Sequence, residues 1–143
     1  MKHASMVLVP LGLAACLTAA VGCATNLRSV ATGASPGPFV RSLEDPCDYH
    51  LLLTGRPQTF GMRSGRVRLA PGKSIGLHNT KDNEELLVFL SGSGVALIGQ
   101  ETHLQVASGK VAYIPPQTTH DIQNTGTEPL MYVFCVAPAG PRR

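Results

Sequence analysis

The sequence predicts an all-β protein, a single-domain β-barrel or sandwich of about nine short strands. Three observations support this prediction. The 143 residues include 15 glycines and 11 prolines, the two residue types least compatible with helices. From Tyr49 onward, short apolar runs alternate with turn residues, and no helical period is present. Hydrophobic residues make up 43% of the chain, which is enough to build a core, and the length suits one domain rather than two.

The expected strands follow one another with short connections. In chain order they span Tyr49–Thr54, Gly65–Ala70, Ser74–His78, Glu84–Leu90, Gly94–Ile98, Thr102–Val106, Lys110–Ile114, His120–Asn124 and Leu130–Ala137. The turns between them are marked by Pro71-Gly72, Lys81-Asp82-Asn83, Ser91-Gly92-Ser93-Gly94, Ser108-Gly109, Pro115-Pro116 and Thr125-Gly126. Strands at this spacing are typical of an all-β sandwich or barrel.

The side-chain patterns within two of these runs support the strand assignments. In residues 66–69, Val67 and Leu69 fall on one face of a strand and two arginines fall on the other. In Glu84–Leu90 nearly every residue is apolar, which is typical of a strand covered on both faces. The first strand is therefore expected to have a solvent face, and the second to be buried on both sides.

The N-terminus has the pattern of a secretory signal. Lys2 precedes an uncharged stretch, residues 4–22, that is rich in Ala, Leu and Val and ends in small residues. Cys16 and Cys23 stand in small-residue contexts that resemble the lipobox of bacterial lipoproteins, in which the cysteine becomes the lipid-modified first residue. The longer apolar stretch favours Cys23 as the attachment site, with Cys16 as the alternative. The chain is thus expected to be an exported, membrane-anchored lipoprotein facing the periplasm or the extracellular side; an uncleaved membrane helix is the competing interpretation.

This assignment divides the chain into four parts: a signal peptide (1–22), a flexible tether (23–44), the β-barrel (45–137) and a C-terminal tail (138–143). The start of the tether is composed of small, polar, Gly and Pro residues without an apolar period. Two further cysteines, Cys47 and Cys135, lie in the barrel. In an oxidising compartment they could form a disulfide, or remain unpaired with Cys135 as a small core residue.

Two histidines and one glutamate are expected to meet in the barrel. His78 ends one strand, Glu85 opens the next across a tight connection, and His120 opens a later one. Period-two alternation places Glu85 on the same face as Leu87 and Phe89, and a buried carboxylate must be paired, hydrogen-bonded or bound to a metal. Two imidazoles and a carboxylate suit a divalent ion such as Fe, Mn, Zn or Ni, and they leave coordination positions open.

The order and spacing of these residues resemble the two motifs of the cupin superfamily. The first motif runs Gly, five residues, His-x-His, three or four residues, Glu, six residues, Gly. The second runs Gly, five residues, Pro-x-Gly, two residues, His, three residues, Asn. The corresponding positions here are Gly72, His78, Thr80, Glu85 and Gly92, then Gly109, Pro115, Gln117, His120 and Asn124. The resemblance covers about residues 45–137 and implies a single-domain cupin, or jelly-roll, β-barrel.

Two motif positions depart from the family pattern. Cupin ligands are usually three histidines and one glutamate, but Thr80 replaces the second histidine, so the resemblance implies only His78, Glu85 and His120 as metal ligands. Thr80 is expected to hold a water or to orient a neighbouring group. Gln117 stands where a glycine would favour the turn, and its amide is expected to point toward the mouth of the barrel. Tyr113 is expected in the core, or alternatively with its hydroxyl in the pocket.

The resemblance implies a divalent metal ion and a small-molecule ligand, with oxygenase or isomerase chemistry at the metal as the leading hypothesis. A non-catalytic barrel that binds a small ligand or a metal is the alternative. The family analogy also allows a homodimer. Nucleic acid is not an expected partner, because the net charge is only +3, no basic run exceeds Arg142-Arg143, and the chain has no Trp.

Overall fold

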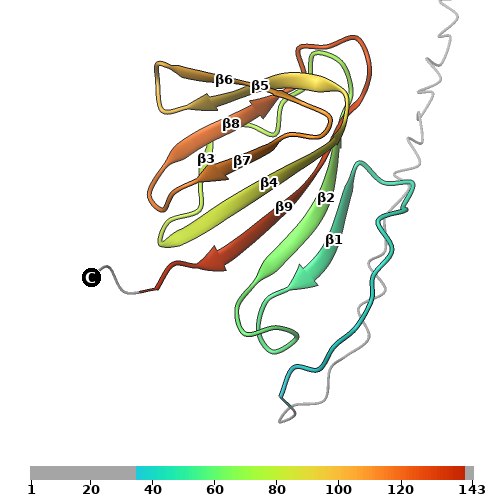
Figure 1. Cartoon of the computed structure of the whole chain (residues 1–143), viewed down its shortest axis with the longest axis vertical. Helices are drawn as coiled ribbons and strands as arrows, with labels where there is room; N and C mark the ends of the chain where they lie inside the picture. The colour runs from blue at the N-terminus through green and yellow to red at the C-terminus, as the bar shows by residue number, and fades with distance from the viewer. Residues whose placement is uncertain (1–34, 141–143) are drawn as a thin grey trace, which may run out of the picture.

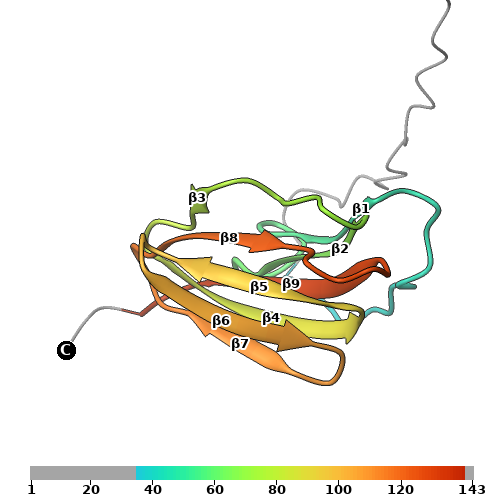
Figure 2. The same cartoon turned by 90° about the horizontal axis from the view of Figure 1, so that it is seen from above.

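Nine strands lie between Tyr49 and Pro138 in the computed structural model, which describes residues 35–140. They form two antiparallel sheets (Figures 1 and 2). The five-stranded sheet has, in spatial order, β1 (Tyr49–Thr54), β2 (Arg63–Leu69), β9 (Leu130–Pro138), β4 (Asn83–Ser91) and β7 (Val111–Ile114). The four-stranded sheet has β3 (His78–Asn79), β8 (Thr119–Gln123), β5 (Ser93–Ile98) and β6 (Thr102–Ala107). The predicted all-β fold is confirmed.

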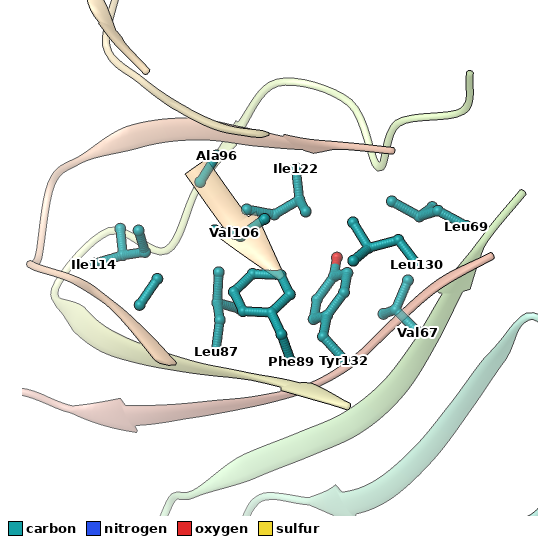
Figure 3. Packing of buried hydrophobic residues seen from close by; sticks show 11 residues of the cluster. Val67, Leu69, Leu87, Phe89, Ala96, Val106, Ile114, Ile122, Leu130 and Tyr132 are labelled. Atoms are coloured by element: carbon teal, nitrogen blue, oxygen red, sulfur yellow. The ribbon is translucent and has the colours of Figure 1, made fainter. Parts of the chain in front are cut away.

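The core lies between the two sheets. Alternate residues of facing strands fill it, as Figure 3 shows for the cluster around Phe89 and Tyr132, whose rings lie 5.5 Å apart. In β4, Glu85, Leu87 and Phe89 share the buried face, as their spacing predicts. The opposite face of β4 is not covered as expected, because Glu84 is exposed and Leu86 is 41% exposed. The nearly continuous apolar run therefore has a solvent-facing side.

The third strand is shorter than predicted. Only His78 and Asn79 pair regularly with β8, and Ser74 forms a single isolated bridge to Gln123. Between them Gly76 has φ +91, a left-handed conformation that interrupts an extended strand. Its amide donates a hydrogen bond to Asp121 Oδ1 instead, at 2.9 Å. The segment therefore follows β8 as an irregular loop and becomes a strand only at His78.

The candidate disulfide between Cys47 and Cys135 is not formed, because Cys135 is a free thiol. Cys135 lies on β9 opposite Ser64 of β2, with 3.4 Å between its Sγ and the serine Oγ. Cys47 precedes β1, and β2 lies between β1 and β9. Two strand spacings amount to about 10 Å, which is beyond the Cα separation that a disulfide spans.

Several expectations concern the N-terminal part of the chain. The signal peptide, Cys16 and Cys23 lie outside the described residues, so they stay predictions. Residues 35–44 carry no strand or helix, and most of their side chains are exposed. Within residues 35–140, no helix is long and apolar enough to cross a membrane.

Candidate metal centre

His78, Glu85 and His120 converge at one end of the space between the sheets. His78 and His120 are directly opposite each other in the β3–β8 pair, and their ring centroids are 4.2 Å apart. Glu85 comes from β4 in the other sheet, and its Oε2 lies 3.1 Å from His120 Nε2. The candidate ligand atoms of all three residues lie within 4.8 Å of one another. The structure thus brings together the three residues that the sequence singled out.

The burial of this group fits a metal site. Glu85 is 4% exposed and His120 is 0% exposed, whereas His78 stands closer to solvent. Glu85 Oε2 and His120 Nε2 are buried, and neither has a hydrogen-bond partner among the described residues. Buried polar atoms without partners are costly. A cation between these atoms would satisfy both, and imidazole nitrogen with carboxylate oxygen is a donor set that suits divalent transition metals.

Both imidazoles are oriented by backbone carbonyls. Nδ1 of His120 bonds the carbonyl oxygen of Thr118 at 3.0 Å, and Nδ1 of His78 bonds that of Gly76 at 2.9 Å. In each case the carbonyl lies two residues before the histidine. A carbonyl acceptor holds the proton on Nδ1 and leaves Nε2 with its lone pair available. The two rings are therefore set in the tautomer that binds a metal.

The electrostatic environment of His120 favours its charged form. Burial alone would lower the pKa of His120, but the Glu85 carboxylate, the Thr118 carbonyl and the charge of Asp121 outweigh it and raise the pKa. A group whose pKa is raised on folding stabilises the fold below its unfolded pKa, and that contribution disappears as the pH rises through the folded pKa.

We therefore expect the stability of the metal-free protein to depend on pH through His120. Its contribution should be full below the ordinary histidine pKa of 6.5 and should be lost as the pH rises through the raised pKa of the folded protein. Urea unfolding of metal-free wild type and His120→Gln over this range measures it as the difference between the two proteins. A difference that stays constant, or grows with pH, would contradict this assignment.

Sequence reasoning missed Asp121, which fixes the loop before His78. Its side chain is 6% exposed, and Oδ1 accepts the Gly76 amide while Oδ2 accepts Gln123 Nε2 at 3.0 Å. Since the Gly76 carbonyl orients His78, Asp121 positions that ligand through the backbone of a single residue, Gly76. The sequence signal was an acid directly after His120, the histidine of the second motif. Its partner Gly76, in the loop before His78, is visible only in the structure.

Replacing Asp121 by Ala is expected to weaken metal binding about 10- to 100-fold, the usual effect of removing a group that orients a ligand. Asp121→Asn keeps an oxygen that can accept the Gly76 amide and should retain most of the affinity. Gln123→Ala removes only the other hydrogen bond of Asp121 and serves as the control. Calorimetric titration with the metal ion measures the affinity of all three variants. Equal affinity in Asp121→Ala and wild type would contradict the positioning role.

Three other residues were expected at the site. Thr80 lines a cavity, described below, beside His78, Glu85 and His120, which are called the triad from here on. Its hydroxyl donates to the Asn83 carbonyl at 3.0 Å within the β3–β4 turn. Gln117 has φ +61, the conformation for which glycine is favoured. Its Nε2 donates to Asp82 Oδ1 in the β3–β4 turn at 2.7 Å, and Gln117 is not among the residues that line the cavity.

Tyr113 is neither in the core nor in the pocket. It is 57% exposed, and its hydroxyl donates to Glu84 Oε2 at 3.1 Å. Alternation along β7 explains this placement, because Ala112 and Ile114 take the buried face and leave Val111 and Tyr113 on the outside.

A cavity of about 450 Å³ opens beside the three candidate ligands, within the range of small-molecule sites. Glu85 and His78 line its polar end, and Leu87, Ile122 and Phe134 line its apolar part. Tyr132 also reaches it, and burial together with the charges of Glu85 and Asp121 raises the pKa of its phenol far above the usual value. The phenol therefore stays protonated and can donate a hydrogen bond.

The structure is thus a β-sandwich with a His/Glu/His group between its sheets that could hold a metal ion. Residues 65–136 match the family model described as a cupin domain. This chain belongs to the cupin superfamily.

The chain is similar to several curated proteins. It is 31% identical over 87 residues to an oxalate-binding protein of Thermotoga maritima, covering 61% of this chain and 71% of that protein. It is 30% identical over 104 residues to a glucose-6-phosphate isomerase of Pyrococcus abyssi, covering 63% of this chain and 54% of the enzyme. It is 36% identical over 67 residues to an uncharacterized protein of Methanocaldococcus jannaschii, covering 47% and 53%. The chain thus spans about half the length of the last two relatives.

Solved structures show the same fold. A cupin protein from Bacteroides fragilis superposes with a TM-score of 0.60 and 21% identity, covering 75% of this chain and 90% of that one. A protein with a double-stranded β-helix domain from Klebsiella pneumoniae superposes with a TM-score of 0.59 and 20% identity, covering 74% and 95%.

Proposed function

We propose that this cupin binds one divalent metal ion through His78, Glu85 and His120 and uses it to hold or transform a small organic molecule in the adjoining cavity. The observation that carries the proposal is the pair of buried atoms without hydrogen-bond partners, Glu85 Oε2 and His120 Nε2, beside a third ligand atom. A bound cation would offset the cost of burying them.

The residues around the triad support chemistry at an open coordination site. Two imidazoles and one carboxylate leave positions for a ligand, and a divalent ion there would supply Lewis acidity or, as iron, a site for O₂. Thr80 is not counted as a fourth ligand in this proposal, because its neutral hydroxyl is a weaker metal donor than the two imidazoles and the carboxylate; it donates to the Asn83 carbonyl within the turn. The protonated phenol of Tyr132 would orient a ligand, and the apolar walls would exclude water around it.

A binding protein without turnover is the second candidate. It is favoured by the similarity to the oxalate-binding protein, whereas the similarity to glucose-6-phosphate isomerases favours an enzyme. The two are separated by product analysis of the metal-loaded protein with small organic acids and sugar phosphates. Ligand-dependent stabilisation without product formation supports the binding protein, and product formation supports the enzyme.

Elemental mass spectrometry tests the metal proposal on the full-length protein, purified without chelators or nickel resin. Wild type is expected to carry about one ion per chain, and His120→Ala should carry little. His103→Ala is the matched control, because this exposed histidine on β6 lies outside the triad. Wild type that stays free of metal after incubation with Fe²⁺, Mn²⁺, Zn²⁺ and Ni²⁺ would overturn the proposal, as would undiminished metal in His120→Ala.

We further propose that the protein is exported and anchored through a lipid on Cys23, so that the barrel works at the membrane surface. The positive start and the apolar stretch before Cys23 support this proposal. Labelling with a radioactive fatty acid in a bacterial host should mark wild type and Cys16→Ser but not Cys23→Ser. Labelling lost only in Cys16→Ser would assign the lipid to Cys16 instead of Cys23. Wild type that takes up no label would overturn the proposed lipid anchor.

A further inference from the structure

Arg63 lies in the same row of the five-stranded sheet as the candidate ligand Glu85. Arg63 on β2 is paired with Val136 on β9, and Val136 is paired with Glu85 on β4. Paired residues of an antiparallel sheet point to the same face, and all three residues line the cavity. Two strand spacings separate the Cα atoms of Arg63 and Glu85, which is about 10 Å. The long side chain of Arg63 therefore faces the triad across one valine.

The guanidinium of Arg63 has no carboxylate or carbonyl partner among residues 35–140. The contrast with Arg66 on the same strand is clear, because Arg66 is buried and donates to the carbonyl oxygens of Asp45 and Cys47 at 2.9 and 2.7 Å. Lys81, at the β3–β4 turn, adds a second positive charge to the cavity lining. The cavity thus contains two cationic side chains in addition to the proposed metal site.

The surface between Arg63 and the triad is apolar and shaped by a glycine. Phe134 lies against β2 at Gly65, where a Cβ would come within 2.7 Å of the phenylalanine ring. Tyr49 stacks on Phe134 with 6.0 Å between the ring centroids. This arrangement leaves a short hydrophobic floor, made by Phe134 and Val136, between two places that attract negative oxygen atoms.

We infer that the ligand of this site is a small organic acid that bridges the two places. One oxygen function binds at the metal, the carbon skeleton lies over Phe134 and Val136, and a carboxylate binds Arg63. This inference rests on the proposed metal site. The Arg63 guanidinium can bind a carboxylate through two parallel hydrogen bonds. A carboxylate is favoured over a phosphate because residues 35–140 contain no helix whose N-terminus could hold a phosphate.

Calorimetric titration of the Mn²⁺-loaded full-length protein tests the inference with two probes. Succinate and monomethyl succinate both have a carboxylate for the metal, but only succinate has a second one for Arg63. Wild type should bind succinate at least about tenfold more tightly than the monoester, since a charge-assisted hydrogen bond is lost in the ester. Arg63→Gln should remove this preference without changing Mn²⁺ affinity.

Three further arms complete the test. Arg68→Gln, on the outer face of the same strand, should behave as wild type, and Arg63→Lys should keep part of the preference as a point charge. Wild type that binds none of Mn²⁺, Fe²⁺, Zn²⁺ and Ni²⁺ overturns the metal site and this inference together; if only another of these ions binds, that ion replaces Mn²⁺ in the titrations. Normal Mn²⁺ binding with no succinate preference, or with the preference intact in Arg63→Gln, overturns the inference alone. Arg63-dependent binding of phosphoglycolate but not of succinate would show that the ligand group bound by Arg63 is a phosphate and not a carboxylate.

Discussion

Metal loading is expected to raise the free energy of unfolding of the wild type by about 3–4 kcal/mol when the free ion is present at 100 to 1,000 times its dissociation constant. An ion bound only by the folded protein stabilises it by mass action, and the triad exists only when both sheets are assembled. Glu85→Gln should lose most of this gain, because it replaces a charged ligand by a neutral amide. Urea unfolding with and without the metal measures both proteins.

The metal-free proteins should keep the same order. Without metal, Glu85 Oε2 lies 3.1 Å from His120 Nε2, and the carboxylate raises the pKa of that imidazole. Glu85→Gln removes one partner of this buried pair and should destabilise the metal-free fold at pH values where His120 is charged. The diagnostic result is therefore the gain on metal loading of each protein relative to its own metal-free form. An equal gain in both proteins would show that the ion binds elsewhere, and His103→Ala should retain the full gain.

Replacing Asn124 is expected to destabilise the protein by about 3 kcal/mol or more. This side chain is 2% exposed. Its Nδ2 donates to the carbonyl oxygens of Leu69 and Glu128, both at 2.8 Å, and its Oδ1 accepts the Gly126 amide at 2.9 Å. Asn124 thus joins the end of β2 to the β8–β9 turn, and Asn124→Ala leaves all three backbone groups without this partner.

Asn124→Asp is the sharper variant because it preserves the shape of the side chain. A carboxylate has no proton to donate, so two carbonyl oxygens would face negative oxygen in a buried site. Urea unfolding of the metal-free proteins should show a loss at least as large as for Asn124→Ala. Asn79→Ala, at an exposed asparagine, should change stability by less than about 1 kcal/mol. A loss below that limit in Asn124→Asp would contradict the structural role.

The strands were predictable because a local pattern determines them. Alternation in β2 and β4 places Val67 and Glu85 on buried faces, as the structure has them. The short β3 was not predictable, because Gly76 leaves the strand to bond Asp121, which lies 45 residues further along the chain. Tyr113 was misplaced for another reason. Its aromatic ring suits either face, and the side that it occupies is set by Ala112 and Ile114.

The triad was predictable in part for a similar reason. The motif spacing selects His78, Glu85 and His120, and the structure brings their ligand atoms together. Arg63 could not be identified as a site residue from the sequence, because its position depends on the register of three strands that are distant in the chain. From the sequence alone, an arginine before an alternating run is interpreted as a surface residue. Only the alignment of β9 and β4 beside β2 places it in the same row as Glu85.

The candidate ligands are divided between the two layers: two histidines belong to the smaller sheet and the glutamate to the larger one. An ion at this place would bind both layers at once and would strengthen the link that the Glu85–His120 contact already makes between them. The effect should be local. We expect the amides of β3 and β8 to exchange with deuterium more slowly in the metal-loaded protein, while those of β1, at the far edge of the larger sheet, keep their rates. Because an ion held by His78, Glu85 and His120 would join the two layers beside the cavity, opening of the cavity and release of the ion would be coupled.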